Sequence, residues 1–586
     1  MNRVRTAALA ILPLIAWSID ADATVIYVDA SATGSGDGSS WINAYPRLAD
    51  ALPTASAGDE VRVAAGIYRP TDTPGDRAAT FTVPDGVHLL GGYAPGGSAE
   101  ADWRTHLTIL SGDIEGDDLD LDGDGTGYAE TDDEIVGLNS LHVVTTSGTS
   151  PDTQLAGFII TAGSSFDLTC DFTPDPPCAG AGILNEGGSP ALLDLFFSAN
   201  VGAHGGGIAN FSASPTIARS RFEGNVGAYG GGGIANVASH PNISLTSFVR
   251  NSGAGGGGVA NWASDPQVVD SDFVENIARS GGAIRNVDSS PSIQRVLFRG
   301  NGNCCSGILS GDGGAVQNLN SSPEFVDVDF VDNTVDFAGA AVYNGANSSP
   351  TMNRVRFVEN VAGLYQSVVH SEGGSSLRVH NGTFFNNAGV PLVNLNAGVV
   401  EVTNATFYAN RWGAIRSSDS ELRLVNASFA GNFLSAATHC SAVNLMSANG
   451  ALSIKNSVVW HENPDSPQPF CASDAGQIEI GHSLIQGCNP AGAWNSLCGN
   501  DLGGNVPDSD PLFTETPEID EFPAASGDLH LDPASPARDA GDNTANPLPV
   551  DLDGNARIVG AAIDLGAFEW RLLPDIFNDG FEATAP

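Results

Sequence analysis

A three-residue pattern recurs at nearly constant spacing through the middle of the chain. A proline is followed seven residues later by phenylalanine, which is followed three residues later by asparagine. The prolines stand at positions 190, 215, 241, 266, 291, 323 and 350. Self-similarity with a period of about 20–50 residues is typical of repeat architectures, in which each unit covers its neighbours. The sequence therefore predicts a solenoid with one turn per repeat.

These repeats favour strands over helices. Glycine clusters at positions 205–207, 230–233, 255–258, 281–282 and 313–314 would each destabilise a helix by about 1 kcal/mol per residue. After each cluster come an apolar residue and, two positions later, asparagine, as in Ile208 and Asn210. Residues two apart share one face of a strand, and the stretch from proline to phenylalanine predicts a second strand. We expect an all-β chain that forms a single right-handed parallel β-helix over about residues 55–490.

The repeated residues predict columns inside this β-helix. Parallel strands of successive turns lie about 4.8 Å apart, so like residues stack on like residues. Phenylalanine would fill the interior, and asparagine amides would bond along a ladder, because an unsatisfied buried amide costs about 1–3 kcal/mol. The column should contain Phe222, Phe248, Phe273 and Phe298. The pattern continues with Phe384, Phe407, Phe429 and Trp460.

Three asparagines of the later repeats look like glycosylation sequons: Asn381, Asn404 and Asn426. Each occupies the same repeat position relative to phenylalanine. We therefore interpret them as repeat consensus residues.

The positions four and six after each proline should face outward. From Asp270 onward their charge alternates between turns, with arginine at 295 and 354 and aspartate at 327. Opposite charges on adjacent strands attract by about 0.2–1 kcal/mol per pair. This alternation predicts ion pairs along the outer face.

Two pairs of carboxylates on this face allow an alternative, catalytic interpretation. Asp270 with Asp272, and Asp327 with Asp329, are two apart on a strand. That places them about 6.5–7 Å apart, which overlaps the spacing in inverting glycoside hydrolases. The alternating charge explains both pairs without chemistry, so we assign no catalytic residue. The histidines of separate turns are interpreted as surface residues: His204, His240 and His370.

The acidic segment DDLDLDGDG predicts a cation site. Oxygen ligands at alternate positions, with glycine for the turn, suit calcium. The candidate ligands are Asp118, Asp120, Asp122 and Asp124. The glutamate that ends an EF-hand loop is replaced by Ala129 or Thr131, so a solvated acidic turn is the alternative to calcium. A shorter version, interpreted as a turn, consists of Asp551, Asp553 and Asn555.

The N-terminus has the features of a secretory signal peptide. Arginines at 3 and 5 precede an apolar stretch over residues 7–17 and an A-x-A cleavage site at 21–23.

Eight cysteines in an exported chain predict disulfides. The candidate pairs are Cys170 with Cys178, Cys440 with Cys471, and Cys488 with Cys498. The adjacent Cys304 and Cys305 are left unassigned.

The chain divides into five predicted parts. These are a signal peptide (1–23), an N-terminal cap with irregular turns (24–180), regular repeats (181–490), a C-terminal capping region (491–570) and a tail (571–586). Residues 40–52 predict an amphipathic helix that would cover the open N-terminal end.

A net charge of −44 repels nucleic acid and anionic lipid. We expect a monomer without a transmembrane segment, with a glycan or a surface protein as partner.

Two groups of motifs resemble known families. GGGI, GGAI and GGAV, paired with FEGN, FVRN, FVEN and FVDN, resemble the repeats of chlamydial polymorphic outer membrane proteins. IYVDASATGSGDGSSW, VRVAAGIYRPT, DWRTHLTILSGDI and VDLDGNARIVGAAIDLGAFEW are similar to the bacterial β-helix proteins grouped as choice-of-anchor Q. The resemblance implies a pectin-lyase-like β-helix that is secreted or held at the surface of a Gram-negative bacterium.

Two functions remain open from the sequence. The first is adhesion, or glycan or protein binding without catalysis, which the charge pattern favours. The second is a polysaccharide-active enzyme, a glycoside hydrolase or lyase. The polygalacturonase signatures are absent, and one lysine in a strongly acidic chain fits poorly with the basic cleft of a lyase.

Overall fold

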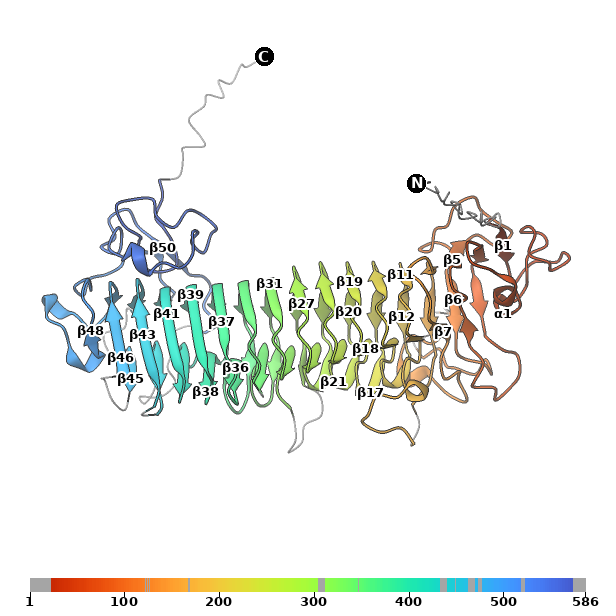
Figure 1. Cartoon of the computed structure of the whole chain (residues 1–586), viewed down its shortest axis with the longest axis horizontal. Helices are drawn as coiled ribbons and strands as arrows, with labels where there is room; N and C mark the ends of the chain where they lie inside the picture. The colour runs from red at the N-terminus through yellow and green to blue at the C-terminus, as the bar shows by residue number, and fades with distance from the viewer. Residues whose placement is uncertain are drawn as a thin grey trace, which may run out of the picture.

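Successive repeats pair strand by strand, in parallel and in register. In the computed structural model, β14 (Ile208–Phe211) lies beside β18 (Ile234–Val237), with Asn210 opposite Asn236. About 15 such turns stack into a right-handed parallel β-helix, which confirms the predicted fold (Figure 1). The structure describes residues 23–572 except 122, 124, 126, 167–168, 304–310, 346, 433–439, 448, 462–468, 473–476 and 518–521. Residues 1–22 of the predicted signal peptide, residues 573–586 of the tail, Cys304 and Cys305 lie outside this part.

A typical turn contains four short strands. After β14 come β15 (Thr216–Ala218), β16 (Arg221–Glu223) and β17 (Val226–Gly230). Stacked over the turns, these strands form a sheet of 27 strands with two from most turns, a sheet of 14 strands, and a short sheet of five. We call the first of these the major sheet.

The single strand predicted from proline to phenylalanine is divided in the early turns. Between β15 and β16, Arg219 adopts a left-handed conformation with φ of 52°. The same column contains Leu245, Asp270 and Arg295, with φ of 51–52°. This bend turns a corner and still leaves the next residue facing inward, as with Ser220, which is buried. From β31 (Glu324–Val331) to β41 (Glu421–Ala430) the two strands merge into one, although Asp327 keeps its positive φ of 56°. The last turns are divided again, as in β43 (Ala451–Lys455) and β44 (Val458–Trp460).

The predicted phenylalanine column is confirmed. Its rings lie parallel at centroid distances of 4.5–5.1 Å from Phe197 to Phe429. All its members from Phe197 to Phe429 are 0% exposed. The extension to Trp460 is wrong by one residue, because Val459 pairs with Phe429 and Trp460 pairs with Ala430. Side chains alternate along a strand, so Trp460 faces away from the core.

The predicted asparagine ladder is also confirmed. From Asn200 to Asn432, each Nδ2 donates to Oδ1 of the asparagine in the next turn at 2.9–3.0 Å. Most also donate to a main-chain carbonyl of the turn before, as Asn251 does to Phe222. A parallel ladder runs from Asn185 to Asn344 at 2.8–3.0 Å. These bonds satisfy amides that would otherwise be costly to bury.

The sequon asparagines form a third, shorter ladder. Asn404 donates to Asn381 at 3.1 Å, and Asn426 donates to Asn404 at 3.0 Å. Asn404 and Asn426 are fully buried, and Asn381 is 8% exposed. Their role as repeat residues is therefore confirmed.

Both ends of the β-helix are covered. The predicted helix over residues 40–52 is only one turn long, α1 (Leu48–Ala51), followed by the 3-10 turn η1 (Leu52–Thr54). Tyr45 precedes Pro46 and is extended, bridged to Val28 of β1 (Val25–Val28), because a residue before proline disfavours the helical conformation. The α1 residues Leu48 and Ala51 still pack on the core. At the other end, the disulfide between Cys488 and Cys498 packs on it.

The remaining two predicted disulfides are present, Cys170 with Cys178 and Cys440 with Cys471. Each of the three disulfides closes a loop of about 30 residues or fewer, so each constrains one loop of the β-helix. Among the described residues, no helix is long and apolar enough to cross a membrane.

The C-terminal part beyond residue 510 lies on the side of the β-helix, not at its end (Figure 1). It includes the antiparallel pair β49 (Phe513–Glu515) and β50 (Asp528–Leu531). The Asn456 amide donates to the main-chain oxygen of Asp542 at 3.0 Å and accepts from its nitrogen at 2.8 Å. Asn386 makes the same exchange with Ala524. The region predicted as a cap, 491–570, is thus divided between the end and the side of the β-helix.

Candidate functional site

The outward carboxylates of the major sheet pair with arginines one turn away. Asp270 accepts from Arg295 at 2.5 and 2.9 Å, and Asp327 accepts from Arg354 at 2.5 and 2.7 Å. Asp329 lies 3.5 Å from a nitrogen of Arg356. The Arg295 hydrogen bond lowers the pKa of Asp270, and the Arg354 hydrogen bond lowers that of Asp327. The predicted ion pairs are confirmed, and they account for three of the four carboxylates considered for catalysis.

A groove of about 650 Å³ lies on the outward face of the early turns. The segment of residues 103–107 contributes Trp103, Arg104 and Leu107. The repeats contribute Phe196 of β12 (Phe196–Ser198), Arg221 of β16, and the bend residues Arg219 and Leu245. Tyr128 comes from the long connection between β6 (Thr108–Ser111) and β7 (Val144–Ser147). No regular pattern links Trp103, Arg104, Leu107 and Tyr128 to the repeat positions, and sequence analysis did not find this groove.

Fixed polar groups accompany the aromatic rings of the groove. Arg219 binds Asp194 through two parallel hydrogen bonds of 2.9 and 2.7 Å. The Arg104 guanidinium lies 5.0 Å from the centroid of the Trp103 ring. Leu245 is 58% exposed. The groove therefore combines apolar and aromatic surface with a few oriented polar groups, which is typical of ligand sites.

A second pocket, of about 430 Å³, lies where the C-terminal part meets the major sheet. Asp327, Asp329 and Arg356 line one side, and Asp553 and Phe568 line the other. The turn predicted at residues 551–555 is confirmed, since Asp551 accepts from the main-chain nitrogen of Asn555 at 2.8 Å.

His530 joins two parts of the C-terminal region beside this pocket. Its Nε2 lies 2.8 Å from Asp553, and its Nδ1 lies 2.5 Å from Asp528. The ring also stacks on Phe568 at 3.8 Å. Hydrogen bonds that the ring donates to Asp553 and then to Asp528 raise the pKa of the imidazole from 6.5 to about 9. His530 is therefore a protonated clamp at neutral pH.

This clamp makes stability depend on pH. Because the folded-state pKa is about 9 against an ordinary value of 6.5, the stabilisation is complete below about pH 6.5 and is lost as the pH rises to 9. We expect the difference in Tm between the wild type and His530→Gln, measured by calorimetry, to shrink over that range. His240→Gln, at a side chain that is 56% exposed, is the control. A His530→Gln difference that stays constant across this range would contradict the clamp.

The prediction that His204 and His370 are surface residues is wrong, whereas His240 is exposed as predicted. His204 is 0% exposed and lies beside the rings of Tyr229 and Trp262, at centroid distances of 6.0 and 5.5 Å. His370 is 1% exposed and stacks on Tyr343. Burial lowers the pKa of His204. Loops and aromatic residues of neighbouring turns cover positions that strand alternation alone would expose.

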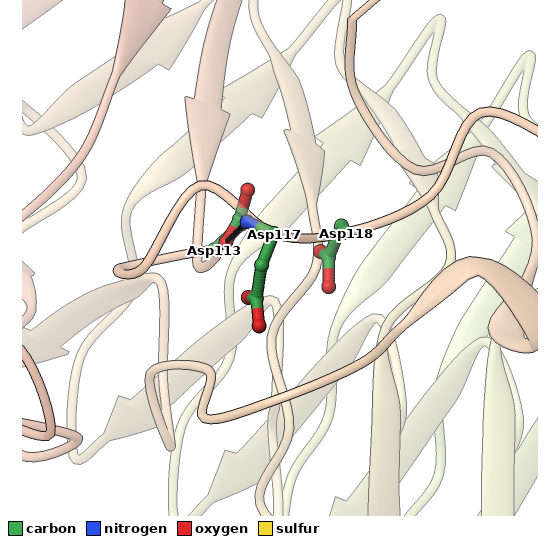
Figure 2. A group of neighbouring side chains, drawn as sticks. All are labelled: Asp113, Asp117 and Asp118. Carbon is green, nitrogen blue, oxygen red and sulfur yellow. Dashed lines mark hydrogen bonds between the residues drawn. The ribbon is translucent and has the colours of Figure 1, made fainter.

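The acidic segment brings carboxylates together in a way that the sequence only partly predicts. One oxygen each of Asp113, Asp117 and Asp118 lie within 4.8 Å of one another (Figure 2). We call these three residues the acidic cluster. Asp120 caps its own loop instead, accepting from Gly123 at 2.7 Å and Gly125 at 3.1 Å. The other two predicted ligands, Asp122 and Asp124, lie outside the described residues.

Comparisons with known proteins show similarity of structure only. No protein-family model and no curated protein matches the chain. Tailspike protein 3 of bacteriophage CBA120 aligns with a TM-score of 0.35 and 11% identity over 79% of this chain and 59% of the tailspike. Pectate lyase Pel9A aligns with a TM-score of 0.26 and 13% identity over 94% of this chain and 96% of the lyase. The chain thus spans less than two thirds of the tailspike, and at these scores we draw no functional conclusion from either similarity.

Proposed function

We propose that this protein is an exported, cell-surface or secreted binding protein that holds a glycan in the groove beside Trp103 and performs no catalysis. The observation that supports this most is the composition of the groove, which places Trp103, Tyr128 and Phe196 beside Arg104 and Arg219. Export rests on the signal-peptide features of the N-terminus and on the resemblance to choice-of-anchor Q and polymorphic outer membrane proteins.

The chemistry of the groove suits a sugar. A sugar ring has an apolar C–H face and a rim of hydroxyl groups. Aromatic side chains offer large rigid surfaces for the apolar face. The two parallel hydrogen bonds between Arg219 and Asp194 fix donors and acceptors for the hydroxyl groups. The arginines and aspartates of this face pair with each other along the sheet. These ion pairs between turns account for the charged residues without a catalytic role.

A glycan array followed by calorimetry tests the proposal. For a glycan that binds the wild type, Trp103→Ala should weaken binding about 30-fold, equivalent to the roughly 2 kcal/mol that marks an interface hot spot. Tyr365→Ala removes a 48% exposed aromatic ring that is not part of the groove, and should leave the affinity unchanged. Equal affinities for wild type and Trp103→Ala would rule out the groove.

The enzymatic alternative requires a separate assay. Reducing-end release should be measured on the same glycan with the wild type and with the double variant Asp327→Asn with Asp329→Asn. We expect no release from either. Release by the wild type that disappears in the folded double variant would replace the binding function with a hydrolase.

A further inference from the structure

The groove and the second pocket lie on one row of outward side chains of the major sheet. In-register pairing extends this row from Phe196 and Arg221 of the groove to Asp329 and Arg356 of the second pocket. Phe196 and Arg356 are six strand spacings apart, which at about 4.8 Å each gives about 29 Å. Because the strands of successive turns stack in parallel, the row runs along the axis of the β-helix.

At both ends of the row, an irregular segment places an aromatic ring beside it. In the groove, Trp103 lines the wall beside Arg221. In the second pocket, Phe568 lines the side opposite Arg356, and His530 stacks on the Phe568 ring at 3.8 Å. The two pockets therefore share one arrangement, an aromatic surface beside fixed polar groups, which is typical of ligand sites.

The part of the row between the two pockets reaches solvent and contains an unpaired acceptor. Its members are Asp272, which is exposed, and Leu297, which is partly exposed. Asp270, Asp327 and Asp329 each pair with an arginine, whereas Asp272 forms no ion pair among the described residues. Figure 1 shows the irregular N-terminal turns and the C-terminal part on the same side of the β-helix, with the turns from β12 to β31 between them.

The row carries no net charge. Arg221 and Arg356 balance Asp272 and Asp329, in a chain whose net charge is −44. A polyanion would be repelled by the whole chain and would find no row of cations to compensate. An uncharged ligand with many hydroxyl groups can instead use both the donors and the acceptors of the row.

We propose that the groove and the second pocket are the two ends of one binding track for a long, linear, uncharged polysaccharide that lies along the β-helix. The binding track is the outward row from Phe196 to Arg356, with Trp103 at one end and Phe568 at the other. A row of side chains at regular spacing suits a ligand that is itself linear and repetitive. This inference rests on the proposed glycan function, to which it adds a second site and a class of ligand. A chain held at one end binds at the other as an intramolecular event, which raises the overall affinity by about 10²–10⁴.

Calorimetric titration with tetramers and decamers of the cello-, manno- and xylo-oligosaccharide series tests the binding track. Tetramers are long enough for the groove alone, and decamers reach from the groove to the second pocket. For at least one series, we expect the wild type to bind the decamer about 100-fold more tightly than the tetramer, the lower end of the gain from two linked sites.

Variants along the binding track separate its two ends. Arg356→Ala should weaken decamer binding about tenfold or more, the size of a lost hydrogen bond to a charged group, and leave tetramer binding unchanged. The Arg356 side chain is 61% exposed and lies 3.5 Å from Asp329, so this variant should fold, and Asp272→Ala provides a second change at an exposed residue. Trp103→Ala should weaken the binding of both oligomers. Arg378→Ala is the matched control, because Arg378 is 51% exposed, pairs across turns like Arg356 and lies outside both pockets.

Three results would overturn the binding track without removing the groove as a glycan site. One is equal affinity for the tetramer and the decamer of a series whose binding depends on Trp103. Another is unchanged decamer affinity in both Arg356→Ala and Asp272→Ala. The third is tighter binding of a galacturonic acid decamer than of every neutral decamer, which would exclude the uncharged class. If no decamer binds, the track is likewise wrong, and the glycan array decides separately whether the groove binds a glycan.

Discussion

Replacing Phe273 by alanine is expected to lower the free energy of unfolding by about 3–5 kcal/mol, the usual cost of removing a buried aromatic ring. Phe273 is 0% exposed and stacks on Phe248 at 4.6 Å and on Phe298 at 5.1 Å. Its removal leaves a gap in a column that is continuous on both sides. The backbone ladder holds the neighbouring turns in place, so they cannot collapse into this gap.

Urea unfolding followed by circular dichroism measures this effect. The matched control is Leu245→Ala, because Leu245 is 58% exposed on the outer face of a neighbouring turn. Surface substitutions usually change stability by about 0.5 kcal/mol or less. Similar losses in the two variants would show that the phenylalanine column is not the core of the β-helix.

The core could be predicted from the sequence because a β-helix repeats the same environment at every turn. Phe222 and Asn225, for example, recur as Phe248 and Asn251, and the structure places each pair in register. Alternation along a strand then gives the inward face. The same logic failed at Trp460, where the repeat loosens and a one-residue shift exchanges inside for outside.

The corner at Arg219 could not be predicted from that residue. Left-handed conformations are commonest for glycine and, among other residues, asparagine and aspartate, so an arginine gives no signal. Later turns do carry one, because Asn381, Asn404 and Asn426 occupy the same column with φ of 52–56°. There the C-terminal part also covers the column, as when Asn404 donates to the carbonyl of Val550 at 2.7 Å.

The candidate sites were less predictable because they combine distant segments. Asp118 was found from its acidic context, but Asp113 and Asn139 approach it only because the connection folds back on itself. The groove joins Trp103 of the irregular N-terminal turns to Arg219 of the repeats. Repetition predicts contacts between equivalent residues, and it cannot predict where an irregular loop meets the repeated surface.

Arg557 is the centre of a buried charged group in the C-terminal part. Its side chain is 0% exposed, and Nη2 donates to the main-chain oxygens of Asp564, at 3.1 Å, and of Gly566. Nη1 lies 4.0 Å from Glu569. Burial lowers the pKa of Arg557 to about 10 and raises that of Glu569 to about 7. The opposite charges therefore share one poorly hydrated site.

Arg557→Met is expected to destabilise the C-terminal part by about 3–5 kcal/mol, because it leaves buried carboxylates without their counter-charge. Arg538→Met is the matched control in the same region. Arg538 stacks over Trp570 at 3.7 Å, an interaction worth about 0.5–1 kcal/mol near a surface. Hydrogen exchange of residues 511–571 measures both effects.

The effect of Arg557→Met should also depend on pH. A buried carboxyl with a raised pKa is stabilising when protonated and costly when charged, so the loss of stability in Arg557→Met should shrink as the pH falls below 7. A loss no larger than that of Arg538→Met, or one that does not change with pH, would show that the buried charges do not hold this part together.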